Sequence, residues 1–228
     1  MDWDDPEKIV NDCIKSQLSI LSGYQMHPTL NIDRYKETLE PKHAAISFDG
    51  EPTLHPELSG LVKEFHRRGL TTFIVTNGTL PEVLKNLSEE PSQLYVSLAA
   101  PDEETFLKTC RPLVPNAWQK LNQTLESLSS FSCPTVVRLT MVRHLNMKNP
   151  EKYAKIIEKA KPTYVEPKGY VYVGMSRERL KFENMPTHND IRNFAQRLSD
   201  LTGYKILDES PDSHVVLLSH LDKPIKLA

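Results

Sequence analysis

The chain has 228 residues, of which 39% are hydrophobic and 25% charged, a composition that excludes disordered and fibrous proteins and fits one globular domain with a full core. Its 28 Lys and Arg against 30 Asp and Glu exclude a global basic field, so any contact with RNA needs a local patch. The acidic N-terminus and the lack of an apolar run of membrane-spanning length predict a cytoplasmic protein without a membrane partner.

The three cysteines do not have the spacing of a metal-binding motif. Cys13, Cys110 and Cys133 are too far apart in the sequence for a CxxC-type loop, so no metal site is expected from them. An odd number of cysteines in a chain without a signal sequence indicates reduced thiols.

Residues 1–43 are expected to form an N-terminal helix followed by a crossover. Asp5 can cap the helix, a proline suits its first position, and Gly23 can end it. Cys13 lies on the apolar face of this helix and is expected in the core. Residues 24–42 contain two prolines and are expected to be a loop.

Residues 44–203 alternate between short apolar runs and amphipathic helices. Thr79 and Glu82 have the spacing of a capping box for one of these helices. Alternation with short connections predicts a parallel sheet with right-handed crossovers, whose ligands bind at the carboxyl ends of the strands. The predicted strands are residues 44–48, 70–75, 94–98, 135–142 and 163–166.

Polar residues recur at the ends of these strands, and each has an ordinary alternative explanation. Glu51 could interact only with the dipole of the next helix, and Asn77 could belong only to a turn. Arg138 and Thr140 could satisfy each other inside a barrel. The co-occurrence of these residues with Ser97 at one edge of the sheet favours a single ligand site.

The C-terminal part departs from the alternating pattern. Residues 168–180 are aromatic and β-branched, then basic, which predicts an extended segment running into a loop that is solvated by default. A last helix is expected from Thr187 to Gly203. Residues 204–228 are expected to form a C-terminal extension with strands at 205–208 and 214–219.

Five sequence blocks stand out, namely residues 47–54 (SFDGEPTL), 76–79 (TNGT), 94–98 (LYVSL), 111–112 (RP) and 173–180 (VGMSRERL). Together they resemble the radical S-adenosylmethionine enzymes, and within them the tRNA 4-demethylwyosine synthases. The resemblance covers the chain from Trp3 to Leu218 and implies a single α/β domain, a partial open (β/α)6-type barrel whose first β/α unit is missing.

The resemblance also implies a cofactor site for S-adenosylmethionine. It places the amino group of the cofactor at Gly50 and Glu51, and its ribose and carboxylate near Asn77 and Ser97. Asp49 departs from the small residue usual at that position and is expected to crowd or repel the carboxylate of the cofactor. The expected cofactor-binding residues are Asp49, Gly50, Glu51, Pro52, Asn77, Ser97, Arg138 and Thr140.

The implied substrates are pyruvate and N1-methylguanosine beside the anticodon of phenylalanine tRNA. Cations interleaved with aromatic residues suit phosphate contacts and base stacking. Ser176 and Arg177 are expected near the substrate. The expected substrate-binding residues are Lys168, Tyr170, Ser176, Arg177 and Arg179, with Lys181 beside them.

The CxxxCxxC loop that holds the 4Fe-4S cluster in this family does not occur in the sequence. We therefore expect no radical chemistry from this chain alone, and expect the cluster module just upstream or on a companion chain. One alternative is a catalytically inactive barrel that binds tRNA or S-adenosylmethionine. Another is an ordinary metal- or aldol-type barrel enzyme using Glu51 and Lys168, which is disfavoured because no set of His and carboxylates has convincing ligand spacing.

Overall fold

The computed structural model describes residues 3–47 and 50–227, and within these residues the strands form one seven-stranded sheet. The sheet order is β1-β2-β3-β4-β5-β7-β6; the first five strands are parallel, and β7 runs antiparallel to both β5 and β6. The strands are β1 (His43–Ile46), β2 (Thr71–Thr76), β3 (Gln93–Ser97), β4 (Thr135–Met141), β5 (Tyr164–Gly169), β6 (Lys205–Ser210) and β7 (Val215–Ser219). The expected parallel α/β fold, with a terminal pair of short strands, is confirmed.

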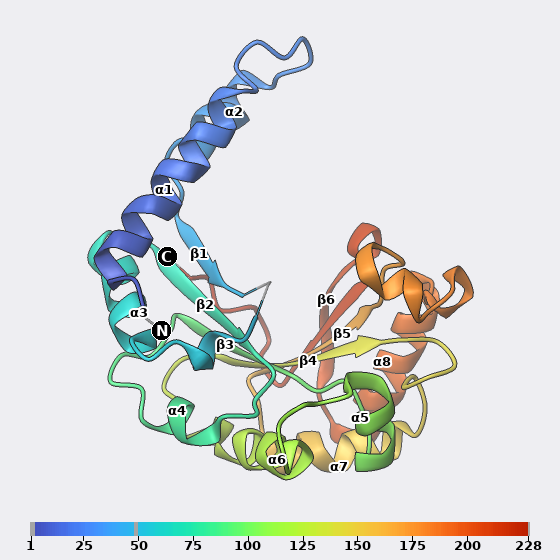
Figure 1. Ribbon diagram of the computed structural model, residues 1–228. Coiled ribbons are helices and arrows are strands. Elements are labelled where there is room, and N and C mark those ends of the chain that lie inside the picture. The colour runs from blue at the N-terminus through green and yellow to red at the C-terminus, as the bar shows by residue number, and fades with distance from the viewer. Residues whose placement is uncertain (1–2, 48–49, 228) are drawn as a thin grey trace.

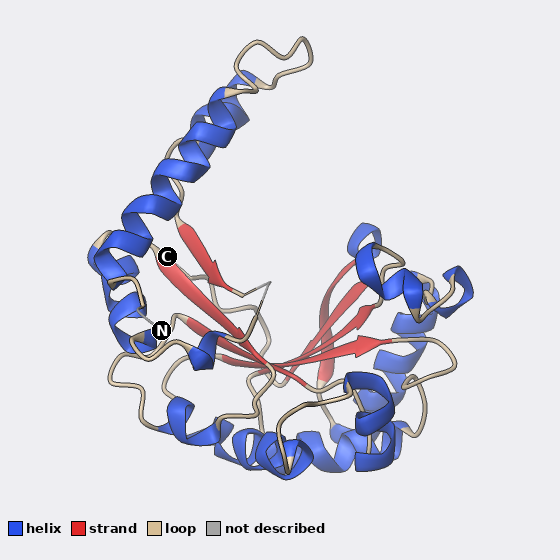
Figure 2. Ribbon diagram, viewed as in Figure 1, coloured by secondary structure: helices blue, strands red, loops and turns tan. Residues whose placement is uncertain are grey.

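The sheet is curved and open, with helices packed against its convex face (Figures 1 and 2). Alternate residues such as Ile74, Val96 and Leu139 are fully buried beneath these helices, as the period of two in a strand requires. The intervening residues therefore face the concave side. The covering helices are α3 (Leu58–Arg67), α4 (Pro81–Lys85), α5 (Glu103–Cys110), α6 (Ala117–Ser127), α7 (Pro150–Ala160) and α8 (His188–Thr202).

Local capping signals explain where several helices begin and end. The Asp5 side chain accepts a hydrogen bond of 2.8 Å from the Glu7 N–H, which starts α1 (Pro6–Ser22) as expected. Thr187 and Asp190 form a capping box at the start of α8, and Gly203 ends this helix with a φ of 74°. These boundaries agree with the sequence analysis.

Two expectations about the N-terminal segment are wrong. Residues 24–42 are not a continuous loop, because Asn31 caps a short helix, α2 (Ile32–Thr38), by accepting from the Arg34 N–H at 3.0 Å. Cys13 is exposed rather than in the core. The arm formed by α1 and α2 extends away from the body, and α1 packs on the α3 side through Ile9, Val10 and Ile14 in its first half (Figure 1).

The capping box expected at Thr79 and Glu82 is also wrong. The Thr79 N–H and hydroxyl donate to the Asn77 side-chain oxygen at 2.9 and 2.7 Å, and α4 begins later, after Leu80, without a side-chain cap. A local Asx turn thus uses the threonine before the helix starts. Within the described ranges, each helix is too short or too polar to traverse a lipid bilayer.

Candidate functional site

The Glu51 carboxylate connects the turn after β1 to the end of β2. One carboxylate oxygen accepts from the Thr53 N–H at 3.1 Å, the Thr53 hydroxyl at 2.7 Å and the Thr76 hydroxyl at 2.5 Å. The other oxygen accepts from the Asn77 N–H at 2.8 Å. Glu51 and Asn77, both expected in the cofactor site, therefore lie together. Glu51 is more than a helix-start carboxylate, because its partners include Thr76, which is 25 residues away in the sequence.

This turn has features suited to an ammonium ligand. Gly50 has a φ of 97°, which L side chains rarely adopt, while a Cβ there would meet no described atom within 4 Å. Glycine is required here by backbone conformation rather than by crowding. The second oxygen of Glu51 accepts one hydrogen bond from the described residues, and a carboxylate oxygen can accept about two.

The hollow that borders this turn on its helical side is apolar. It has a volume of about 370 Å³ and is lined by Trp3, Ile9 and Leu58 together with Gly50 and Glu51. A charged, polar ligand is not matched by such a lining. The concave face of the sheet is the better candidate for the site.

A half-buried ion pair occupies the middle of that concave face. Arg138 on β4 donates from Nε to Glu166 on β5 at 2.6 Å, and its guanidinium carbon lies 4.5 Å from the centre of the Tyr95 ring on β3. Only 8% of Glu166 is exposed. Burial, followed by the Glu166 charge, raises the pKa of Tyr95. Arginine suits this position because its planar group can pair and stack at once.

Arg138 and Thr140 do not satisfy each other, as the alternative explanation in the sequence analysis had it. Arg138 is satisfied by Glu166 and not by Thr140. Sequence reasoning missed Glu166 as a site residue and placed it only at the end of a strand. The available signal was a lone carboxylate in an otherwise buried strand, since such a charge needs a partner.

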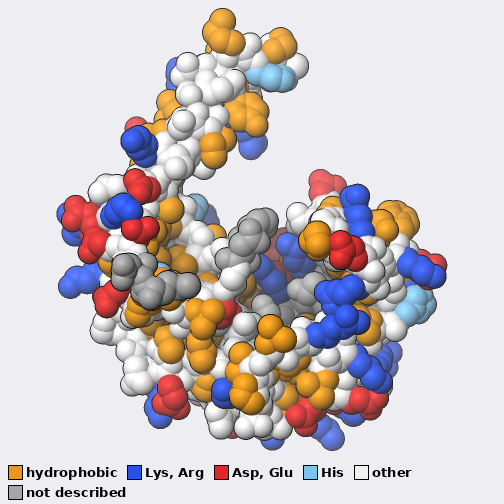
Figure 3. Space-filling model, viewed as in Figure 1, with side chains coloured by type: hydrophobic (Ala, Val, Ile, Leu, Met, Phe, Trp, Pro, Cys, Tyr) orange, Lys and Arg blue, Asp and Glu red, His pale blue; other side chains and the backbone are white. Residues whose placement is uncertain are grey.

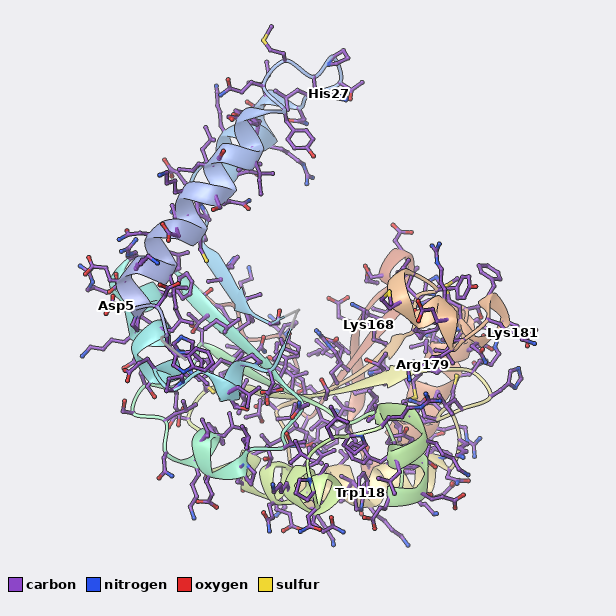
Figure 4. The ribbon with its side chains drawn as sticks, viewed as in Figure 1. Asp5, His27, Trp118, Lys168, Arg179 and Lys181 are labelled. Carbon is purple, nitrogen blue, oxygen red and sulfur yellow. The ribbon has the colours of Figure 1, made fainter. Side chains whose placement is uncertain are left out.

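Lys168 lies beside this pair. It follows Glu166 by two positions on β5 and is in register with Thr140 on β4, so all three share the concave face. Figure 4 shows Lys168 directed toward the hollow, whereas Lys181 lies on the outer side and Arg179 lies between them. In the space-filling view, Lys and Arg side chains gather on this side of the hollow (Figure 3).

The loop after β5 is held by two of the expected substrate residues. The Tyr170 hydroxyl and the Ser176 hydroxyl lie 2.8 Å apart, and Ser176 also donates to the Val173 carbonyl at the start of a 3-10 turn (Gly174–Glu178). Tyr170 is 8% exposed, while Arg177 and Arg179 are exposed. Tyr170 and Ser176 thus face each other, and the two arginines face solvent.

Two further residues expected in the cofactor site, Ser97 and Pro52, lie on the sheet and in the turn after Glu51, respectively. Ser97 is in register with Arg138 on the concave face, and Pro52 begins a short 3-10 turn (Pro52–Leu54) after Glu51. Asp49 lies outside the described residues. The structure therefore gathers Ser97, Arg138, Thr140 and Lys168 on one surface, with Glu51 and Asn77 at the ends of the neighbouring strands.

Two sequence families match consecutive parts of the chain. The radical SAM superfamily matches residues 22–157, and the wyosine base formation family matches residues 159–220. A tRNA 4-demethylwyosine synthase of Methanocaldococcus jannaschii is 37% identical, over 98% of this chain and 70% of the relative. The chain belongs to the tRNA 4-demethylwyosine synthase family of radical SAM proteins.

Other members of the tRNA 4-demethylwyosine synthase family are also similar. The synthase of Pyrococcus abyssi is 51% identical over 96% of this chain, and the chain spans 66% of that relative's length. The structure of TYW1 with a lysine–pyruvate adduct bound has a TM-score of 0.87 and 36% identity, over 96% of this chain and 70% of that one. A crystal structure of archaeal TYW1 has a TM-score of 0.81 and 33% identity, over 99% and 74%.

The family implies S-adenosylmethionine and a 4Fe-4S cluster, and the described residues fit these groups differently. The Glu51 turn suits the amino group of the cofactor. No group of three or more His, Cys, Asp or Glu that could hold a metal occurs in residues 3–47 and 50–227. Burial, followed by the charge of Glu90, raises the pKa of Cys133 to about 12, which disfavours the thiolate form that binds iron. These residues do not fit the cluster.

Proposed function

We propose that this chain is the part of a tRNA 4-demethylwyosine synthase that binds S-adenosylmethionine and tRNA. The reaction of the synthase converts N1-methylguanosine beside the anticodon of phenylalanine tRNA, with pyruvate, into the tricyclic base. The observation that supports this proposal most is the convergence of polar residues from β3, β4 and β5 on a single concave face. The strand β5 belongs to residues 159–220, which match the wyosine base formation family.

The proposed cofactor site extends from the Glu51 turn across the ends of the strands. The second oxygen of Glu51 receives the ammonium of the cofactor, next to the backbone of Gly50. Asn77 and Ser97 bind its ribose and carboxylate, and Arg138 and Thr140 line the same cleft. Among residues 3–47 and 50–227, Arg138 contacts Glu166 through Nε, which leaves its terminal nitrogens for the ligand.

The proposed substrate site lies where the basic loop borders the hollow. Lys168 reaches toward the target nucleotide, and Arg177 and Arg179 contact the RNA backbone as phosphate-binding cations. Tyr170 and Ser176 position this loop through their mutual hydrogen bond. The lysine–pyruvate adduct in the TYW1 structure supports pyruvate as the second substrate.

Because the described residues do not fit the iron–sulfur cluster, no radical step is assigned to them. The test compares this chain with the gene product extended upstream to the preceding in-frame stop codon, after anaerobic reconstitution. Iron and sulfide content, binding of phenylalanine tRNA, and formation of the tricyclic nucleoside from tRNA, pyruvate and S-adenosylmethionine are measured. We expect both forms to bind tRNA and only a form with a CxxxCxxC loop to hold the cluster and make product.

Two other outcomes would change this proposal. If both forms bind tRNA or S-adenosylmethionine and neither holds iron, even with a companion protein added, the inactive binding barrel becomes the better account. Failure of this chain to bind either ligand, while its thermal unfolding is cooperative, would overturn the proposal altogether.

A further inference from the structure

The loop between β5 and α8 contains an aromatic platform that the sequence analysis did not single out. The rings of Tyr172 and Phe182 are perpendicular, with centres 6.2 Å apart. The guanidinium carbon of Arg177 lies 5.4 Å from the centre of the Tyr172 ring, and its Nε donates to the Tyr172 carbonyl at 3.3 Å. We call these three residues the Tyr172–Phe182 platform.

Phe182 is exposed although its backbone is firmly held. It is 68% exposed and starts a 3-10 turn (Phe182–Asn184). The Asn184 side chain accepts from the Lys181 N–H at 2.8 Å and donates to the Arg143 carbonyl at 2.9 Å. The Arg143 N–H also donates to the Asn184 carbonyl at 2.8 Å. The turn is thus fixed to the segment after β4, and Phe182 contributes little buried area to it.

A mostly exposed phenyl ring on a well-anchored backbone is preorganised to bind a ligand. Its conformational entropy is already reduced, so less is lost when a flat ligand covers it. Tyr172 holds the ring edge to face, and Arg177 in turn covers Tyr172. The exposed face of Phe182 is therefore the part of the platform available for stacking.

The surroundings of the platform favour a nucleic-acid base over an apolar protein segment. Residues 177–183 include Arg177, Arg179 and Lys181 against Glu178 and Glu183. The contact of Lys181 with Glu183 is 3.9 Å long, and both side chains are mostly exposed, so it is weak. Proteins commonly bind single-stranded RNA with an aromatic face bordered by cations, because bases stack on the ring and phosphates contact the cations.

We propose that Phe182 stacks on an unpaired nucleobase that flanks the target nucleotide, while Arg177 and Lys181 contact the adjacent phosphates. This inference rests on the proposed function and adds a base-binding position to it. Tyr170 then serves to position the loop, because its hydroxyl is hydrogen-bonded to Ser176. The stacking position is the exposed ring of Phe182, whose neighbour in sequence, Lys181, lies on the outer side of the loop (Figure 4).

The test uses the anticodon stem–loop of phenylalanine tRNA with 2-aminopurine at successive positions of the loop. Phe182→Ala is expected to weaken binding about 5- to 150-fold, the change that the loss of roughly 1–3 kcal/mol of stacking produces. Phe182→Trp is expected to retain affinity, and Phe182→Leu to resemble alanine, because leucine keeps the apolar surface without a stacking face. One 2-aminopurine position is expected to be quenched by the wild type and not by Phe182→Ala.

Salt dependence separates stacking from charge. Phe182→Ala is expected to leave the slope of log affinity against log salt unchanged, whereas Lys181→Gln reduces it by about one. Ile20→Ala on the N-terminal arm is the matched control, because Ile20 is 63% exposed and lies on a different element. It is expected to bind as the wild type does. Circular dichroism and thermal melts confirm that each variant is folded.

The outcomes distinguish this inference from the proposed function. Binding of Phe182→Ala or Phe182→Leu equal to the wild type would overturn the stacking position and leave the proposed function standing. If the wild type does not bind the stem–loop but binds unstructured single-stranded RNA through Phe182, the platform stands and the proposed function fails. If the folded wild type binds neither the stem–loop nor unstructured RNA, both fail.

Discussion

At the scale of single residues, two carboxylates organise the site: one accepts hydrogen bonds from two strand ends, and the other forms an ion pair with the adjacent strand. Glu51 accepts four hydrogen bonds from Thr53, Thr76 and Asn77, and so connects β1 to β2. Glu166 neutralises Arg138 on the adjacent strand. Buried or half-buried charges of this kind are costly to leave alone, which makes each a sensitive point for mutation.

Glu51→Gln tests the first carboxylate. The amide would offer an N–H₂ group to donors that now point at an oxygen, so unfolding in urea should require about 1–3 kcal/mol less free energy. Titration calorimetry should show S-adenosylmethionine binding weakened about tenfold or more, because one charge-assisted hydrogen bond is lost. Glu57→Gln, at an exposed position nearby, is the control and should change neither quantity. Unchanged stability of Glu51→Gln would refute the structural role.

The second carboxylate, Glu166, is tested by Glu166→Gln and Arg138→Met, made singly and together. Either single change leaves a charge without its partner and should destabilise the fold by roughly 2 kcal/mol or more, whereas the double variant should recover part of that loss. Chemical denaturation of the four proteins measures the coupling between the two sites. Additive effects of the two changes would show that the pair is not coupled.

At the scale of elements, the start of α5 is joined to α7 through one side chain. Asp102 accepts from the Thr105 N–H at 2.9 Å, as an N-cap, and from Lys152 on α7 at 2.7 Å. The hydrogen bond from Lys152, followed by those from Thr105, holds the pKa of Asp102 well below its ordinary value. The carboxylate form is therefore favoured by folding, and it contributes stability only where it is ionised.

Asp102→Ala is expected to lower the free energy of unfolding by about 1–2 kcal/mol at pH 7. A lowered folded-state pKa stabilises the protein above the unfolded pKa, and this contribution is lost as the pH falls through the folded value. The difference between wild type and Asp102→Ala should therefore be constant from pH 7 to about 5 and shrink below about 4. Urea denaturation across this range measures it. A difference that grows on acidification would contradict the assigned ion pair.

At the scale of the whole molecule, the barrel is open, and its edge strand β1 has less support than its central strands. In the described part of the chain, β1 pairs with β2 alone, whereas β4 pairs with both β3 and β5. About half of the N–H groups in an edge strand point away from its neighbour and exchange with solvent readily. The sheet is curved (Figure 2), and the space-filling view shows a hollow on its concave side, which the proposed tRNA ligand requires (Figure 3).

Hydrogen exchange measured by mass spectrometry should reveal this asymmetry. Amides of β1 are expected to exchange on the order of 100-fold faster than those of β4, because global opening is not needed to expose them. The strand β2, which is paired on both sides, is the internal control and should resemble β4. Equal protection of β1 and β4 would indicate that the β1 edge is covered in solution, for example by a second copy of the chain.

Much of the fold follows from local pattern in the sequence. The five parallel strands and the ends of α1 and α8 were predictable, because apolar periodicity, Asp5, Thr187 and Gly203 act within a few residues. The short helix α2 was missed, since seven residues are too few to show a periodic apolar face. The exposure of Cys13 was missed because the helix pattern does not say how far its apolar face is covered.

For the site, the sequence by itself determined which polar residues end the strands and which family they resemble. Only the tertiary structure decided their partners: Arg138 with Glu166, 28 residues away, and Glu51 with Thr76, 25 residues away. It also decided that Tyr170 faces Ser176 while Phe182 faces solvent. The physical reason is that strand register and loop anchoring set side-chain neighbours over long sequence separations, where local propensity contains no information.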